Sequence, residues 1–219
     1  MTYTMRDMPA PLAPHLVEKA LKVETATIGH RRFMGFVDPE IQAVHGYRIA
    51  GTAVTLALPG QDSTLLHHII QYLRPGDVLV IDRLGDRRHA CLGGAVACAL
   101  KTRGTAGVLI DGPCTDVPEI VQYDLPVWCR GPSPITTRLY DVGGAFNVDI
   151  QCGGAVVHPG DLVICDFSGA LVLPADEAEA EVDWALGKQR LEPASHLALK
   201  AGAYLGIDTG ATEKVLAKL

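Results

Sequence analysis

Two carboxylates and a hydroxyl follow a short apolar run in the segment Asp111-Gly112-Pro113-Cys114-Thr115-Asp116. The run Val108-Leu109-Ile110 predicts a buried strand, and α/β sheets bind ligands beyond the carboxyl ends of their strands. Asp116 suits Mg²⁺, a hard cation that takes one or two carboxylates and keeps several waters. The alternative is that Asp116 caps the helix predicted from Pro118. For Asp111 we expect a structural role in holding the Gly-Pro turn.

A second candidate is the segment Gly93-Gly94-Ala95-Val96, which begins a helix predicted to run to about Arg103. Free backbone N–H groups and the positive end of the helix dipole attract an anion there, and glycine lets a ligand approach closely. The alternative is that the two glycines serve tight helix packing. We expect the working site between this helix start and the turn at 111–116.

Nearby basic residues offer further chemistry. His89, four residues before Gly93, is a candidate acid or base because imidazole titrates near neutral pH. Arg87 and Arg88 precede the glycine helix and Arg130 follows a predicted strand, so any of the three could bring a cation to the site. Zinc-binding spacings such as HExxH are absent, and so are GxSxG and phosphate-loop motifs. The sequence therefore gives no support to a zinc enzyme, a serine hydrolase or a nucleotide-binding protein.

The composition limits the class of protein. The chain has 219 residues, 48% hydrophobic and 20% charged, which is ordinary for a globular domain. A formal net charge of -6 argues against general nucleic-acid binding, which needs clustered Lys and Arg. No apolar run reaches the ~20 residues that span a bilayer, and the N-terminus lacks the apolar core of a signal peptide. Six cysteines without a CxxC pair predict reduced, mostly buried thiols in a cytoplasmic protein.

Strands and helices must position these groups. Periodicity predicts helices over residues 15–27, 64–72, 93–103, 118–123, 176–188 and 193–200. Apolar, β-branched runs predict strands over residues 47–58, 78–82, 106–111, 126–129, 145–150, 155–158, 162–166 and 169–173. Because strands alternate with helices in the middle and short strands cluster later, we expect a mixed α/β domain and not a pure doubly wound sheet.

Local motifs refine this pattern. The phrase Pro-Gly-Asp precedes an apolar run at both Pro75 and Pro159, which predicts two similar strand entries. Gly153-Gly154 predicts a hairpin between the strands at 145–150 and 155–158. The proline-rich segment 1–14 is expected to wander or to dock on a neighbour.

Taken together, these segments resemble the RraA-like family. That family contains the 4-hydroxy-4-methyl-2-oxoglutarate/4-carboxy-4-hydroxy-2-oxoadipate aldolases and the regulator of ribonuclease E activity. The matching segments, in order over roughly residues 25–174, are Arg48 to Thr55, Pro75 to Asp82, Gly93-Gly94 with its helix, Arg103 to Gly112, Arg130 to Pro134, Asn147-Val148 and Pro159 to Pro174.

The resemblance implies a fold of stacked β and α layers, of the swivelling β/β/α type, with N- and C-terminal helices. It implies one domain over residues 1–219, with a core at about 25–174 and a C-terminal helical extension at 175–219. It also implies a homotrimer or homohexamer with its site at the subunit interface.

The family pattern also assigns the site. It implies that Asp116 holds a divalent metal, Mg²⁺ or Mn²⁺, and that the backbone amides of Gly93, Gly94, Ala95 and Val96 bind the pyruvate part of the substrate. A C-terminal glutamate from the neighbouring subunit, here Glu192, would position waters on the metal.

Two departures from the family pattern concern the site. The family arginine before the metal-binding aspartate is Thr115 here, and a hydroxyl cannot supply the charge-assisted hydrogen bonds of a guanidinium. Some aldolases carry an acidic residue at the position of Gly94. A further departure lies outside these positions: the segment Thr25 to His30 lacks the Ser-Asp pair that the family usually has after Thr-Ala-Thr-Val.

The leading hypothesis is a metal-dependent lyase that cleaves a pyruvate-containing oxo acid, by retro-aldol cleavage or oxaloacetate-type decarboxylation. Asp116 would hold the metal and Thr115 would donate one hydrogen bond to the substrate. One alternative is a diverged enzyme whose substrate differs because of Thr115, and another is a non-catalytic protein-binding regulator. Neither a nucleic acid nor a membrane is expected as a partner.

Overall fold

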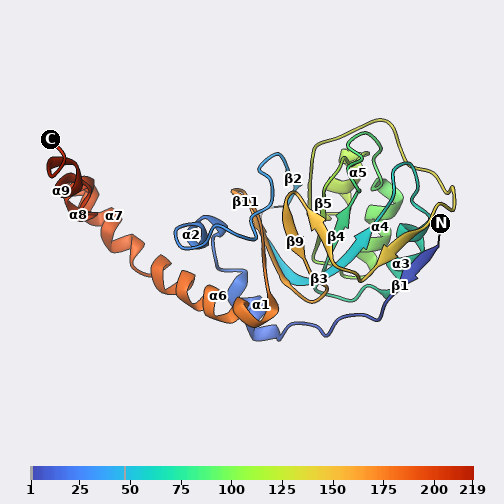
Figure 1. Cartoon of the computed structure of the whole chain (residues 1–219), viewed down its shortest axis with the longest axis horizontal. Helices are drawn as coiled ribbons and strands as arrows, with labels where there is room; N and C mark the ends of the chain where they lie inside the picture. Colours follow the sequence, from blue (N-terminus) through green and yellow to red (C-terminus); the bar gives the residue numbers. More distant parts are fainter. Residues whose placement is uncertain (1, 47) are drawn as a thin grey trace.

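The computed structural model describes residues 2–46 and 48–219, which form a mixed sheet covered by helices (Figure 1). The strands are β1 (Tyr3–Met5), β2 (Gln42–His45), β3 (Ile49–Ala57), β4 (Asp77–Asp82), β5 (Gly107–Ile110), β6 (Val127–Cys129), β7 (Gly144–Phe146), β8 (Ile150–Cys152), β9 (Ala155–Val157), β10 (Leu162–Asp166) and β11 (Gly169–Leu173). The helices are α1 (Pro14–Ala20), α2 (Thr25–Gly29), α3 (Thr64–Ile69), the 3₁₀ helix η1 (Ile70–Tyr72), α4 (Gly94–Thr102), α5 (Val117–Gln122), α6 (Ala175–Gln189), α7 (Glu192–Lys200), α8 (Leu205–Asp208) and α9 (Ala211–Leu216).

The centre of the sheet is parallel. Strands β3, β4, β5 and β6 pair in that order, each parallel to the next, and β2 pairs with β6 in the antiparallel sense. Long β3 has a further antiparallel partner at each end, β10 near Ile49 and β7 near Ala57. Every residue of β4 and β5 is buried, as expected for the unbroken apolar runs at 78–81 and 108–110 that they contain.

The molecule is built in β and α layers. On one face of the sheet, α3, α4 and α5 bury a core that includes Leu66, Leu100 and Ile120. On the other face a second core joins the central strands to β8, β9 and β10 and contains the fully buried Trp128. A third core lies between α1, α2 and α6 and the β10–β11 pair. The expected mixed α/β fold of stacked layers is confirmed.

The helix predicted over 15–27 is wrong, because the chain forms two helices, α1 and α2, with a break between them. The break is set by a distant contact: the N–H and the hydroxyl of Thr25 both donate to the carboxylate of Asp166 at 2.8 Å. This buried pair fixes Thr25 at the start of α2. The periodicity of residues 15–27 cannot reveal a contact with a residue so distant in the sequence.

The strand predicted over 145–150 is also divided. Asn147 has a left-handed backbone (φ 54°), so β7 ends at Phe146 and pairs with β1 and β3, whereas β8 pairs with β9. The turn at Gly153-Gly154 is confirmed, with φ of 51° and 81°. Part of the segment 2–14 docks on its own chain, because β1 pairs with β7.

The repeated Pro-Gly-Asp phrase does mark two similar strand entries. Asp77 accepts a hydrogen bond from the N–H of Arg74, and Asp161 accepts one from the N–H of His158, both at 2.8 Å. In each case the carboxylate closes the turn three residues back, before β4 or β10 begins.

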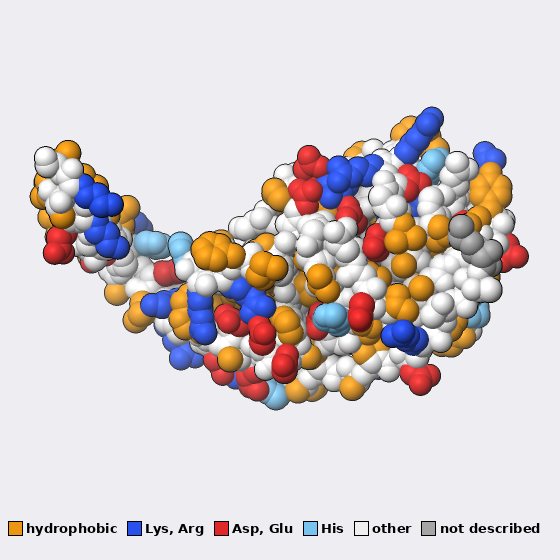
Figure 2. Space-filling view, viewed as in Figure 1, with side chains coloured by type: hydrophobic (Ala, Val, Ile, Leu, Met, Phe, Trp, Pro, Cys, Tyr) orange, Lys and Arg blue, Asp and Glu red, His pale blue; other side chains and the backbone are white. Residues whose placement is uncertain are grey.

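The C-terminal helices α7, α8 and α9 form an arm that extends away from the sheet, and the outline is concave between arm and body (Figures 1 and 2). We use "arm" for residues 191–219. Many of its large apolar side chains are exposed: Leu191, Leu197, Tyr204, Leu205, Ile207, Val215, Leu216 and Leu219. Across residues 2–46 and 48–219, no helix has the length and apolar character needed to cross a membrane.

Candidate active site

Asp116 and the start of α4 face one another. Asp116 occupies the N-cap position of α5 with a left-handed backbone (φ 52°), but its side chain makes no capping hydrogen bond. Instead its Oδ2 accepts a hydrogen bond from the N–H of Gly94 at 3.1 Å. The capping alternative is therefore wrong, because the exposed carboxylate is directed at a different helix.

Gly93 permits this close approach. A Cβ atom at Gly93 would lie 2.5 Å from Oδ2 of Asp116 and 2.9 Å from Cγ2 of Thr115. The N–H groups of Gly94, Ala95 and Val96 lie in the first turn of α4, where helix geometry leaves backbone donors without intrahelical partners. The glycine pair thus brings a carboxylate turn against the first turn of α4, where Asp116 takes the N–H of Gly94 and those of Ala95 and Val96 have no intrahelical partner.

Thr115 lies beside the carboxylate. Its hydroxyl donates to Oδ1 of Asp116 at 3.3 Å, and its backbone N–H donates to the carbonyl of Leu92 at 2.8 Å. The second bond ties the turn to the segment that leads into α4. Thr115 thus lies next to Asp116 and Leu92, but its side chain carries no positive charge.

Glu119 is a neighbour that the sequence analysis missed. A Cβ atom at Gly94 would lie 1.5 Å from Oε2 of Glu119, so this carboxylate fills the space that a side chain at position 94 would need. Glu119 follows Asp116 by three residues and lies in the first turn of α5. The i, i+3 spacing of Asp116 and Glu119 could have predicted this, because residues three apart share one face at a helix start.

Arg130 does not reach the site. Its guanidinium, nearly buried, donates to the carboxylates of Asp38 at 2.9 Å, Glu40 at 2.7 Å and Asp111 at 2.5 Å. Asp111 also accepts the N–H of Gly153 at 2.8 Å, so it is structural, but it holds Arg130 and the β8–β9 turn and not the Gly-Pro turn.

Of the remaining candidate cations, Arg87 pairs with Glu40 at 3.6 Å. The side chain of Arg88 is exposed and makes no ion pair with any residue that the structure describes. His89 is held by Asp86, with Nδ1 and Oδ2 2.7 Å apart, and neither ring nitrogen contacts Gly93 or Asp116 within the described ranges. A role for His89 as acid or base stays a prediction.

Three thiols lie beneath the site. Cys91, Cys114 and Cys129 are buried in the core under α4, and all six cysteines are free. Burial raises the pKa of Cys91 to about 11, so its thiol stays protonated at neutral pH. These side chains pack as small apolar groups, as the sequence analysis expected.

The donor set restricts the metal that could bind. Within residues 2–46 and 48–219, no group of three or more His, Cys, Asp or Glu side chains is arranged to hold a metal. A closed cage of the structural zinc type therefore does not fit. The exposed carboxylates of Asp116 and Glu119 do fit a hard cation such as Mg²⁺, which binds through one or two carboxylates and keeps its waters.

Glu192 lies far from this site within one chain. It begins α7 and lines a 390 Å³ cavity with His30, Trp184 and Lys188, at the root of the arm. Helices α4 and α5 are on the opposite side of the molecule (Figure 1). Only a neighbouring copy could bring a Glu192 to Asp116, and that role stays a prediction.

Known proteins resemble this chain in sequence and in structure. Residues 22–172 match the RraA-like family described as Aldolase/RraA. A Halalkalibacterium halodurans protein, provisionally named 4-hydroxy-4-methyl-2-oxoglutarate aldolase, is 32% identical over 152 residues, which cover 69% of this chain and 72% of that protein. A Hahella chejuensis protein with the same provisional name is 29% identical over 143 residues, 65% of this chain and 87% of that one.

A solved structure has the same fold. Streptomyces coelicolor RraAS2, described as an unusual member of the RNase ES inhibitor RraA protein family, is 29% identical and superimposes with a TM-score of 0.76. The match covers 87% of this chain and 98% of that one.

Proposed function

Because the chain belongs to the Aldolase/RraA family, we propose that it is a divalent-metal-dependent lyase that cleaves a pyruvate-containing oxo acid. The substrate would be of the 4-hydroxy-4-methyl-2-oxoglutarate type, cleaved by retro-aldol chemistry, or oxaloacetate, which is decarboxylated. The single observation that supports this most is the carboxylate of Asp116 at the open first turn of α4. Both reactions leave negative charge on the oxo oxygen of the pyruvate half.

Each part of the site has a role in this proposal. The N–H groups of Ala95 and Val96 bind the carboxylate of the pyruvate half, as helix starts bind anions, and the N–H of Gly94 keeps Asp116 beside them. Asp116 and Glu119 would hold Mg²⁺ or Mn²⁺, which when bound stabilises the charge on the oxo oxygen as a Lewis acid. Thr115 donates one hydrogen bond to the substrate.

The charge balance makes the cation necessary for binding. Asp116 and Glu119 bring two negative charges to the site, and Thr115 stands where the family pattern has an arginine. An anionic substrate is repelled by these carboxylates until a divalent cation neutralises them. Removal of the metal should therefore abolish substrate binding as well as turnover.

Thr115 also favours one alternative, an enzyme of the same scaffold with a different substrate, because a hydroxyl and a guanidinium select different groups. We further propose a homotrimer or homohexamer that is completed by Glu192 of a neighbour. Free thiols throughout suggest a reducing compartment, the cytoplasm.

The test is pyruvate release, coupled to lactate dehydrogenase, from oxaloacetate and from 4-hydroxy-4-methyl-2-oxoglutarate. The assay compares Mg²⁺, Mn²⁺ and EDTA on the wild type, Asp116→Asn and Thr115→Arg. We expect metal-dependent release that Asp116→Asn reduces by ~10²-fold or more. Release from Thr115→Arg alone would support the diverged enzyme. No release from any variant would reject the lyase and favour a binding role.

A further inference from the structure

The site lacks a cation for the second carboxylate of a dicarboxylic substrate. The first turn of α4 offers donors for one carboxylate, and Thr115 offers only a hydroxyl. Charge-assisted hydrogen bonds from a guanidinium are about twice as strong as neutral ones, so selective binding of a dicarboxylate needs a charged donor nearby.

Most of these arginines are already committed. Arg83 is fully buried and donates to the carbonyls of Leu58 and Gly60. Arg130 is held by carboxylates and Arg87 pairs with Glu40. Arg88 differs, because its guanidinium is exposed and has no ion-pair partner in the part of the chain that the structure describes.

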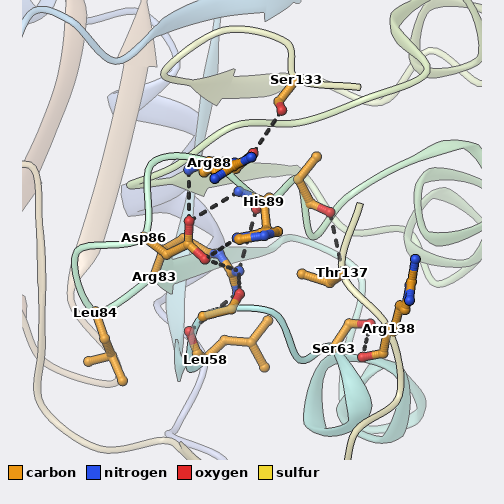
Figure 3. Close-up of polar contacts among 12 residues, drawn as sticks. Leu58, Ser63, Arg83, Leu84, Asp86, Arg88, His89, Ser133, Thr137 and Arg138 are labelled. Atoms are coloured by element: carbon orange, nitrogen blue, oxygen red, sulfur yellow. Dashed lines mark hydrogen bonds and ion pairs between the residues drawn. The ribbon is translucent and has the colours of Figure 1, made fainter. Parts of the chain in front are cut away.

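The backbone that carries Arg88 is held rigidly from below (Figure 3). Oδ1 of Asp86 accepts the N–H of Arg88 at 2.7 Å and that of His89 at 3.1 Å, while Oδ2 binds the ring of His89. The buried guanidinium of Arg83 donates to the carbonyl of His89 at 3.4 Å. A buried cation and a carboxylate thus hold a surface loop on which the side chain of Arg88 is exposed.

The same loop is bonded to the candidate site. Ser133 donates its hydroxyl to the carbonyl of Arg88 at 2.7 Å and its backbone N–H to the carbonyl of Cys114 at 2.8 Å. Cys114 directly precedes Thr115. The N–H of Thr115 in turn donates to the carbonyl of Leu92, which lies four residues after Arg88 in the sequence. Two routes therefore connect Arg88 to the 111–116 turn. One runs through Ser133 to Cys114, and the other runs along the backbone to Leu92 and from there to Thr115.

We propose that Arg88 binds the second carboxylate of a dicarboxylic oxo acid and so replaces the charge that is missing at Thr115. This rests on the proposed site at Asp116 and α4, and it adds the residue that recognises the second carboxylate of the dicarboxylic substrates proposed there. The bonded loop matters because it fixes the backbone of Arg88, so that only the side chain has to lose conformational entropy when it binds its ligand. Arg88 is a specificity-determining residue that acts on binding of the substrate's second carboxylate.

The test measures binding without turnover. In the presence of Mg²⁺, calorimetry compares 2-oxoglutarate with 2-oxopentanoate, which has the same chain without the second carboxylate. We expect the wild type to bind 2-oxoglutarate ~10- to 100-fold more tightly, as one charged hydrogen-bond pair provides. Arg88→Gln should lose this preference and leave the affinity for 2-oxopentanoate unchanged. The matched control is Arg87→Gln, one residue away on the same loop, which should keep the preference.

Each outcome separates this inference from the lyase. If the wild type has no preference, or if Arg88→Gln keeps it, the role of Arg88 is rejected even where pyruvate is released. If the preference depends on Arg88 but no substrate yields pyruvate, the binding role stands and the lyase fails. Equal losses in Arg88→Gln and Arg87→Gln would also reject the assignment, because only a general effect of loop charge would remain. Melting temperatures of both variants establish that each is folded.

Discussion

At the scale of single residues, one buried carboxylate joins the start of α3 to the segment before β7. Asp62 is fully buried at the start of α3 and accepts hydrogen bonds from the N–H groups of Thr64 at 3.0 Å, Tyr140 at 3.0 Å and Val142 at 2.8 Å. Burial alone would raise the pKa of Asp62, but these bonds and that of the Thr64 hydroxyl outweigh it and lower the pKa to about 2. The ionised carboxylate is thus the form that the fold prefers.

Ionisation of Asp62 therefore makes the fold more stable at neutral pH than in acid. A folded-state pKa below the ordinary value of 3.8 stabilises the fold above about pH 4, and the contribution is lost as the pH falls toward 2. We expect Asp62→Asn to lower the free energy of unfolding at pH 7 by about 2 kcal/mol and to flatten its dependence between pH 4 and 2. Urea unfolding at several pH values measures this. The exposed control Asp7→Asn should show the same pH dependence of the free energy of unfolding as the wild type. If Asp62→Asn also kept the wild-type pH dependence between pH 4 and 2, the prediction would be contradicted.

At the scale of elements, the approach of the 111–116 turn to α4 depends on Gly93. Gly93→Ala would put a Cβ 2.5 Å from Oδ2 of Asp116, a flexible side-chain end, so the carboxylate must move while the fold survives. We expect ~10- to 100-fold less pyruvate release, since small displacements at a reacting centre have effects of this size, with little change in melting temperature. The control is Gly187→Ala in α6, where a Cβ meets nothing within 4 Å. It should be as active as the wild type and up to about 1 kcal/mol more stable. Full activity in Gly93→Ala would show that the position of Asp116 does not matter.

Elements whose signals are local could be predicted from the sequence. The buried runs of β4 and β5, the helix start at Gly93-Gly94 and the turn at Gly153-Gly154 all lie where the residues indicate. The break before α2 could not be predicted, because Thr25 is held by Asp166, 141 residues away. For the same reason the sequence brought Asp116 and α4 into one region but could not exclude Arg130, whose three carboxylate partners come from distant segments.

At the scale of the whole molecule, the arm is the feature that a single copy leaves without cover. Burial of exposed side chains such as Leu197, Ile207 and Leu216 against a second copy stabilises the assembly. The free energy gained is roughly 25 cal/mol per Å² of apolar surface removed from water. We expect light scattering to give a trimer or hexamer for the full chain and a smaller species for a chain that ends at Arg190. A second variant, Leu197→Glu in the full chain, should also weaken assembly. Equal masses for all three proteins would reject assembly through the arm. The single-domain division, with a core at 25–174, predicts that the shortened chain still melts in one transition.

The two tryptophans of the chain lie in different settings. Trp128 is enclosed in the sheet core and donates its indole N–H to the carbonyl of Asp166 at 3.0 Å. Trp184 stands at the root of the arm, with the charged groups of Arg31 and Lys188 5.2 Å and 5.8 Å from its ring. The fluorescence of the protein therefore has two separable sources, one that reports on the intactness of the body and one on the surroundings of the arm. A quencher dissolved in the solvent reaches only the second, so light emission can follow the arm in the intact protein without any attached dye.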